Sequence, residues 1–194
     1  MKILYVDQVK KFVSAQEYLA LKKVYKNVDS IDPQQSFFFP EIFYKLAWHI
    51  NPKIFEPIVN NYMLSKIKKS YDLIFVRQGT YIGKNLILKL KKKTNKIIFL
   101  CHDNPFVSRD KQRFKLCLPA LKYYDLMVFI QSSRIKLSKK YGVKKTLLVL
   151  PSYDKKIHRP QKISIYEKKK YCNDVIFIGT WSIEKGIFIK KISL

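Results

Sequence analysis

Glycine is scarce in this sequence, at 5 of 194 residues, and where it is missing it excludes a common kind of site. The first apolar run, residues 2–6, is followed by a segment with a helical pattern at 14–25. Dinucleotide-binding proteins place a glycine-rich turn between two such elements, so that the backbone can approach the pyrophosphate. Residues 6–16 contain no glycine, and no G-x-x-x-x-G-K-[ST] loop occurs in the chain. A dinucleotide fingerprint and a P-loop are therefore both absent.

Cysteines and long apolar runs are also few. Cys101, Cys117 and Cys172 are odd in number, far apart, and lie in or beside apolar runs, which predicts buried reduced thiols rather than disulfides or a zinc site. No stretch approaches the roughly 20 apolar residues of a membrane span, and the amino-terminal run is too short for a signal peptide. No metal-ligand spacing and no Asp-X-Asp motif is present. We expect a cytoplasmic protein without a metal site.

Acidic residues are outnumbered, with 14 Asp and Glu against 39 Lys and Arg, which gives a net charge of +25. Nucleic-acid readers usually rely on arginine, whereas lysines are spread along the predicted helices here, so nucleic-acid binding is disfavoured. The basic field favours anions such as nucleotide diphosphates, phospholipid-linked acceptors or an acidic membrane leaflet. Only five of the basic residues are arginine: Arg77, Arg109, Arg113, Arg134 and Arg159.

Apolar runs that alternate with helical segments indicate βαβ units and a parallel sheet. The runs are short, as expected of strands buried on both faces. We predict an α/β fold with a Rossmann-like parallel sheet and helices on both faces. The predicted strands are 2–6, 27–31, 72–76, 96–101, 126–130 and 146–150, and the predicted helices are 14–25, 40–50, 82–93, 113–124 and 135–141.

Local signals suggest how some of these helices begin and end. Ser14 can cap the first helix with Glu17 three residues later. Gly142 is placed to end the helix at 135–141 in a left-handed conformation. The aromatic-rich stretch 36–64 leaves two interpretations open: a helix that packs its aromatics on the sheet, or a patch that contacts a membrane or an acceptor lipid.

Candidate binding residues follow from the topology. Ligands of open α/β sheets bind beyond the carboxyl ends of the strands, so polar residues after each strand should converge on one rim. The predicted substrate-binding residues are Asp7, Gln8, Arg77, Gln78, Gly79, Gln131, Ser132 and Tyr153.

His102 and Asp103 follow the apolar run at 96–101 and combine two groups that can accept a proton. His102 is the one histidine of three placed at a strand end. A histidine or carboxylate at the rim can take the proton from an attacking hydroxyl. The alternative is that Asp103 and Asn104 form a turn before Pro105. We keep both interpretations, and assign His102 and Asp103 as candidate catalytic residues.

A family resemblance covers the whole chain loosely and residues 125–185 best. Tyr141, Gly142 and Val143, then VLPSYDKKIHRP, then NDVIFIGTWSIEKG resemble the domain junction of GT-B glycosyltransferases, of the spore-maturation CgeB-like, group 1 type. In that family an amino-terminal Rossmann-like domain faces the acceptor. A second domain, opened by a strand ending in "IGT", holds the nucleotide-sugar. The resemblance implies a donor site at Gly179, Thr180, Trp181 and Lys185.

This resemblance organises the chain into an acceptor-side domain at 1–155, a linker at 156–172, and the first strand and helix of a donor-side domain at 173–194, with strand 174–178 outside the main sheet. It implies a metal-independent transfer of sugar from a nucleotide-sugar co-substrate to a glycan, lipid-linked or protein acceptor, without a bound cofactor. This chain by itself should be inactive, since half a cleft cannot position both substrates. The alternative function is a non-catalytic Rossmann-like module whose basic surface docks on an anionic membrane or on nucleic acid.

Overall fold

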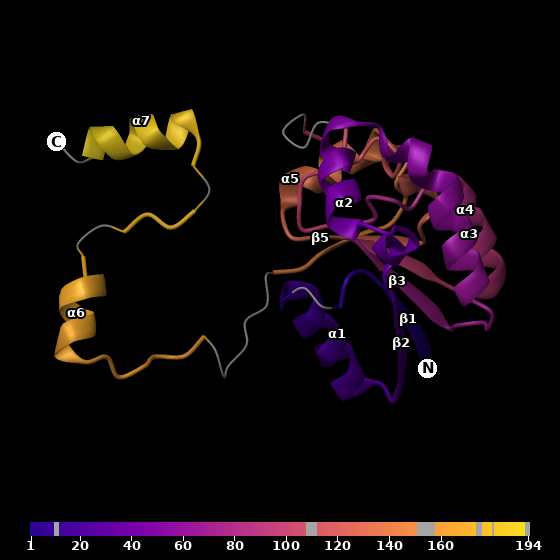
Figure 1. Ribbon diagram of the computed structural model, residues 1–194, viewed down its shortest axis with the longest axis horizontal. Coiled ribbons are helices and arrows are strands. Elements are labelled where there is room, and N and C mark those ends of the chain that lie inside the picture. Colours follow the sequence, from indigo (N-terminus) through magenta and orange to yellow (C-terminus); the bar gives the residue numbers. More distant parts are fainter. Residues whose placement is uncertain (10–11, 108–111, 151–157, 174–175, 180, 193–194) are drawn as a thin grey trace. The chain divides into compact units, whose positions relative to one another are not determined.

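The chain divides into two compact units, Met1–Pro151 and Ser152–Leu194. A computed structural model describes residues 1–9, 12–107, 112–150, 158–173, 176–179 and 181–192, and Figure 1 traces these parts along the sequence.

Six strands of the described residues form one sheet, in which every neighbouring pair is parallel. The strand order is β2-β1-β3-β4-β5-β6, so the fold is α/β and Rossmann-like, as predicted. Five predicted strands are reproduced to within a residue or so, and the sixth is shorter than expected. The strands are β1 (Lys2–Val6), β2 (Asn27–Ile31), β3 (Leu73–Arg77), β4 (Ile97–Leu100), β5 (Leu126–Phe129) and β6 (Thr146–Leu148).

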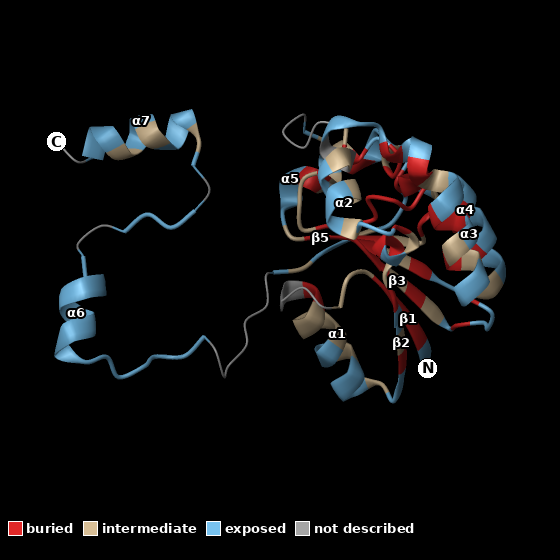
Figure 2. Cartoon of the chain, viewed as in Figure 1, coloured by how far each residue is buried: buried red, intermediate tan, exposed pale blue. Residues whose placement is uncertain are grey.

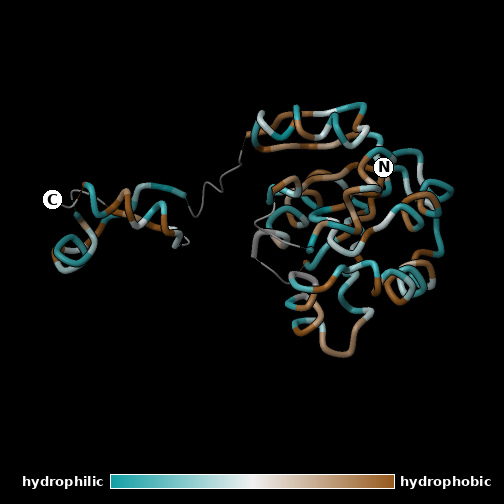
Figure 3. The backbone as a smooth tube through the Cα atoms, turned by 90° about the horizontal axis from the view of Figure 1, so that it is seen from above, coloured by the Kyte–Doolittle hydropathy of each residue, from teal (hydrophilic) through white to brown (hydrophobic). Residues whose placement is uncertain are grey.

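Helices pack on both faces of this sheet. On one face α1 (Phe12–Val24) covers Ile3 and Tyr5 of β1 with Tyr18 and Leu21. On the other face the larger core cluster joins Leu4 and Val6 to apolar side chains of α3 (Glu56–Lys66) and α4 (Lys84–Leu90). Alternate residues of β1 thus enter opposite cores, as the pleat requires. Figure 2 shows the buried strands in red, and Figure 3 the hydrophobic strand segments running through the first unit.

Two helix predictions need correction, and one helix was not predicted. The first helix begins at Phe12, so Ser14 lies inside it, and its hydroxyl bonds to Asp7 instead of capping. The predicted helix at 113–124 consists of turns and the 3-10 helix η5 (Leu118–Tyr123), because Pro119 has no N–H for an α-helical bond. Helix α3 was not predicted, because Pro52 and Pro57 interrupt the apolar pattern around its start.

Other helix predictions are confirmed. Helix α2 (Pro40–His49) and helix α5 (Ser132–Lys139) lie close to their expected positions, and α4 continues into the 3-10 helix η3 (Lys91–Lys93). Gly142 has φ +75°, the left-handed conformation expected where a helix ends.

The aromatic-rich stretch divides between core and surface. The short 3-10 helices η1 (Pro33–Ser36) and η2 (Pro52–Phe55) flank α2. Phe37 stacks on Phe43 with ring centroids 4.6 Å apart, and both meet Phe55 edge to face. Phe38, by contrast, is 98% exposed. The core interpretation therefore holds for Phe37, Phe43 and Phe55, while Phe38 faces solvent.

The second unit has two helices and no buried residue among those described. Helix α6 (Ile165–Tyr171) begins with a capping box in which Ser164 and Glu167 exchange hydrogen bonds. It lies within the stretch predicted as a linker. Helix α7 (Ile183–Ile192) matches the helix expected near the carboxyl terminus. Residues 176–178, the described part of the predicted strand 174–178, are not assigned to a strand and do not join the six-stranded sheet.

The cysteines and the helices bear on two further expectations. Cys101 and Cys117 are buried free thiols, as predicted, but Cys172 is exposed because it follows α6, which buries nothing. Among the described residues, no helix combines the length and the apolar character that crossing a membrane would require.

Candidate functional site

A pocket of about 270 Å³, lined mostly by polar residues, lies at the carboxyl edge of the sheet. Its walls come from the residues that follow β1, β2, β3 and β4, which the parallel topology brings to one edge. Three carboxylates and two guanidinium groups are among them, beside amides and hydroxyls. The lining residues are Asp7, Gln8, Ser14, Asp32, Pro33, Gln34, Arg77, Gln78, Gly79, Thr80, Tyr81, Ile82, Asp103 and Arg113.

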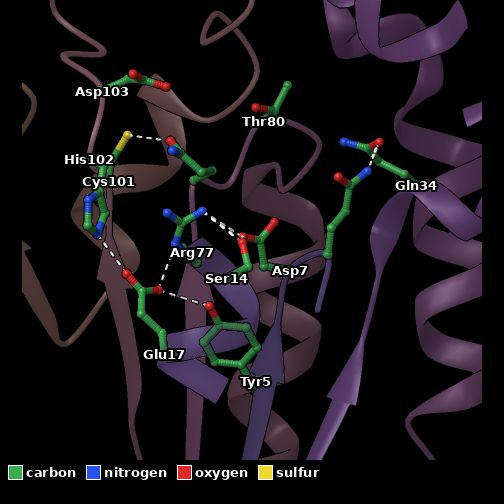
Figure 4. Close-up of polar contacts among 12 residues, drawn as sticks. Tyr5, Asp7, Ser14, Glu17, Gln34, Arg77, Thr80, Cys101, His102 and Asp103 are labelled. Carbon is green, nitrogen blue, oxygen red and sulfur yellow. Dashed lines mark hydrogen bonds and ion pairs between the residues drawn. The ribbon is translucent and has the colours of Figure 1, made fainter. Parts of the chain in front are cut away.

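Arg77 is at the centre of the hydrogen-bond network beneath the pocket, as Figure 4 shows. Its side chain is only 8% exposed. One terminal nitrogen donates to Asp7 Oδ2 at 2.9 Å and to Ser14 Oγ at 3.0 Å. Its Nε lies 2.6 Å from Glu17 Oε2, which makes an ion pair although the N–H is not well aligned for a hydrogen bond. A buried charge needs such partners, and Arg77 has two.

The network shifts the proton affinities of its members. Burial by itself would raise the pKa of Glu17, but the hydrogen bond from His102 and the charge of Arg77 outweigh it and hold that pKa below its usual value. Burial would lower the pKa of Arg77, but the charges of Glu17 and Asp7 raise it. Burial, with the negative charge of Glu17, raises the pKa of Tyr5. Glu17 is therefore ionised and Tyr5 neutral at neutral pH.

His102 is held by Glu17 on the α1 side of the sheet. His102 Nε2 lies 2.8 Å from Glu17 Oε1, while Tyr5 donates its hydroxyl to Glu17 Oε2 at 2.9 Å. Glu17 thus bridges the imidazole, the phenol and the guanidinium of Arg77, as seen in Figure 4. A carboxylate in this position fixes the orientation of the imidazole ring.

Asp103 turns away from His102 and lines the pocket. Its Oδ2 accepts from Arg113 at 2.9 Å, and the Nε of Arg113 reaches the hydroxyl of Thr80 at 3.3 Å. Arg113 is 4% exposed and Thr80 is 6% exposed, so this side of the pocket is built from ordered, paired groups. The two adjacent candidate catalytic residues therefore belong to different networks.

Arg134 explains why adjacent residues can point apart. One of its terminal nitrogens lies within 3.2 Å of the carbonyl oxygens of Cys101, His102 and Asp103, to which it donates. These carbonyls follow the end of β4 and have no strand partner, so a buried guanidinium satisfies them. Arg134 thereby fixes the backbone of residues 101–103, which directs the side chain of His102 to one side and that of Asp103 to the other.

The turn after β3 forms another wall of the pocket. Gln78 and Gly79 both have φ +62°, and Gln78 is the only described residue other than glycine with positive φ. A Cβ at position 79 would lie 2.5 Å from the Phe99 ring, so only glycine fits there. The carbonyl of the Gln78 side chain accepts from Cys101 Sγ, whose pKa burial raises to about 12. Backbone strain of this kind concentrates at functional sites.

No known protein family matches this chain, and a search of curated proteins finds none that is significantly similar. The fold and the geometry of the pocket therefore carry the functional argument.

The structure brings some of the predicted site residues together and leaves others apart. Gln131 and Ser132 are exposed and do not line the pocket, since they follow β5 on the far side of β4. The pocket contains six of the predicted residues: Asp7, Gln8, Arg77, Gln78, Gly79 and Asp103.

The predicted donor residues belong to the second unit. Trp181 is 68% exposed, and Lys185 places its ammonium 5.7 Å from the centroid of the Phe177 ring. Gly179 lies in a bend beside Phe177. Tyr153 and Thr180 lie outside the described residues.

Sequence reasoning missed Asp32, Gln34, Arg113 and Glu17. The signal for Asp32 and Gln34 was present, because both follow β2 and the rule used for the other strands applies to them. Asp32 caps η1 by accepting from Gln34 N, and Gln34 accepts from Gln8 across the pocket. The sequence pattern predicts Glu17 in a capping box and Arg113 in a helix, and neither position by itself indicates a role in the site. In the described residues no cluster of three metal-ligating side chains is found.

Proposed function

We propose that this chain contains the acceptor-side domain of a GT-B-type glycosyltransferase, related to the CgeB-like, group 1 type. In this proposal the pocket holds the acceptor sugar. The observation that supports it is the chemistry of the pocket: carboxylates, amides and hydroxyls from four strand ends, with both guanidinium groups already paired to acids. Such a lining offers many donors and acceptors with little net charge, which suits a polyhydroxylated ligand better than a phosphate.

An anionic ligand fits this pocket less well. Asp7 lies directly after β1, at the amino end of α1, where Rossmann-type dinucleotide sites bind a pyrophosphate. Its carboxylate accepts from Ser14 within α1 and from Arg77. A bound phosphate would meet this carboxylate at short range. The proposal therefore assigns the nucleotide-sugar to the donor-side residues Gly179, Thr180, Trp181 and Lys185, on the resemblance alone.

Asp103 is the proposed general base, because it lines the pocket whereas His102 does not. The Asp103 carboxylate takes the proton of an acceptor hydroxyl, the hydroxyl oxygen bonds to the anomeric carbon, and the nucleoside diphosphate leaves with the electrons of the broken bond. Arg113 and Thr80 hold Asp103 in place. His102, oriented by Glu17, is the alternative base for an acceptor that approaches from the α1 side.

Saccharide binding tests the proposal on residues 1–194 as they stand. Saturation-transfer NMR with a panel of mono- and oligosaccharides should detect at least one ligand. Its signal should be lost in Asp103→Asn and in Gln34→Ala, two changes in the pocket lining. Asp72→Asn, which alters an exposed carboxylate that accepts from the Lys2 backbone at the opposite edge, is the control and should bind normally.

Turnover supplies the second test. We expect no sustained release of nucleoside diphosphate from a nucleotide-sugar by residues 1–194, because two half-sites must close around both substrates. Failure of every saccharide to bind, or binding that survives both pocket changes, would contradict the acceptor assignment. Steady turnover by this chain would contradict the division into two half-sites.

A further inference from the structure

Lysines gather at the amino edge of the sheet, opposite the pocket. In a parallel sheet all strands begin at one edge, and the helices that lead into them end there. Exposed lysines occupy the last turns of these helices and the connections to the strands. We call this set the lysine edge: Lys2, Lys22, Lys23, Lys26, Lys66, Lys68, Lys69, Lys91, Lys92, Lys96, Lys122, Lys139, Lys140, Lys144 and Lys145.

Backbone hydrogen bonds join the connections that carry these lysines. Asp72 N donates to the carbonyl of Lys2, and Ile74 N donates to that of Lys96, each at 2.9 Å. Met127 N donates to the carbonyl of Lys145 at 3.0 Å. Because these bonds link neighbouring strands across the sheet, the lysine edge is one continuous surface and not a set of separate loops.

Little negative charge balances the lysine edge. Lys69 pairs with Asp29 and Lys91 with Asp125, each at 2.7 Å, and the exposed carboxylate of Asp72 accepts from the Lys2 backbone N–H. The carboxyl ends of α1, α3, α4 and α5 each contribute about half a negative charge, roughly two units together. Lysines in the last turns of these helices are partly explained by that dipole. Lys68, Lys144 and Lys145 lie beyond the last turns, so the dipole does not account for them.

The residue types at this edge favour one kind of anionic partner. Arg77, Arg113 and Arg134 are buried at the other edge, so their guanidinium groups cannot serve here. Nucleic-acid binding usually combines arginine forks with aromatic side chains for stacking. Lysine is a hydrated point charge, and clustered lysines bind anionic lipid headgroups without a shaped groove. We propose that the lysine edge docks on the surface of an anionic lipid bilayer.

This proposal does not depend on the glycosyltransferase assignment. Docking by the amino edge turns the carboxyl edge, with its pocket, away from the bilayer. A ligand of the pocket then arrives from the aqueous side. The exposed Phe38 and Phe39 lie after η1, which follows the carboxyl end of β2. They mark the alternative surface that the experiment must exclude.

Vesicle co-sedimentation of residues 1–194 tests the proposal. Vesicles of phosphatidylcholine with about a third of phosphatidylserine should bind the chain, vesicles of phosphatidylcholine alone should not, and binding should fall steeply with added salt. The variant Lys26→Gln, Lys68→Gln, Lys92→Gln, Lys144→Gln removes four exposed lysines without a carboxylate partner. It should lower the partition coefficient by roughly 10²- to 10³-fold, since each lysine contributes about one factor of five.

A matched variant removes the same charge elsewhere in the first unit. Lys45→Gln, Lys53→Gln, Lys84→Gln, Lys115→Gln changes four exposed lysines away from the amino edge and should lower partitioning by less than about five-fold. Equal losses in the two variants would overturn the proposal. So would loss of binding in Phe38→Ser/Phe39→Ser with binding intact in the first variant, or tighter binding to duplex DNA or RNA than to the anionic vesicles at equal phosphate concentration.

Discussion

Both units of this chain are rich in isoleucine and aromatic residues, yet among the described residues only those of the first unit are buried. Phe99, Ile74 and Met63 are fully enclosed in the first unit, whereas Ile165, Phe177 and Ile183 of the second unit are exposed, a contrast visible in Figure 2. Both units have helices with good local signals, and α6 has a complete capping box. The difference shows that capping and helix propensity are enough to form a helix, whereas a stable domain also requires neighbouring elements that bury its apolar side chains.

Hydrogen exchange should show the largest difference between the units. Amides of β1 and β3 open only with the whole domain, so we expect protection factors of about 10⁴ or more. Amides of α6 and α7 belong to short helices without a core, which are marginal in water, and should be protected by less than about ten-fold. Exchange measured by NMR or mass spectrometry at neutral pH checks this. Strong protection in α7 would show that a packing partner for it exists within residues 1–194.

Two substitutions of glycine by alanine, one in each unit, test the same difference in packing between the units. Gly79→Ala forces a Cβ against the Phe99 ring at a residue with φ +62°, so it should lower the free energy of unfolding by roughly 2–4 kcal/mol. In Gly186→Ala the new methyl meets the far end of the exposed Trp181 side chain, which can move. The second change should alter the global unfolding free energy by less than about 0.5 kcal/mol. Denaturant titration measures both, and equal losses would contradict the comparison.

The sheet could be predicted from the sequence because its strands are short apolar runs at regular spacing. Residues 2–6 and 27–31 match β1 and β2 to the residue. The site residues that follow β1, β3 and β4 could also be predicted, because the carboxyl ends of parallel strands meet at one edge of the sheet. The partners of those residues could not be predicted, since Glu17 meets His102, and Arg113 meets Asp103, only through tertiary packing. In the second unit, residues 176–178, the described part of the predicted strand 174–178, are not assigned to a strand, because an apolar run forms a strand only where a neighbouring strand pairs with it.

Acidification gives a smaller effect, which we expect at Glu17 of the first unit. The pKa of Glu17 is lowered in the folded state, so its contribution to stability is complete above its unfolded pKa of about 4.5 and is lost as pH falls through the lower folded value. The free energy of unfolding should therefore decline from about pH 5 downward. Glu17→Gln should be less stable at neutral pH by about 1–3 kcal/mol and should show a shallower decline in acid. Parallel pH profiles of the two proteins would contradict this role of Glu17.

The central claim is that the first unit folds independently and forms the pocket, proposed to bind a saccharide, without help from the second. The most direct measurement compares residues 1–151 with residues 1–194, in thermal unfolding and in the affinity for the saccharide that the full chain binds. We predict midpoints within about 3 °C of each other and dissociation constants within about two-fold, because no described residue of the second unit is buried. A shorter chain that fails to fold, or that folds and no longer binds the saccharide, would contradict the claim.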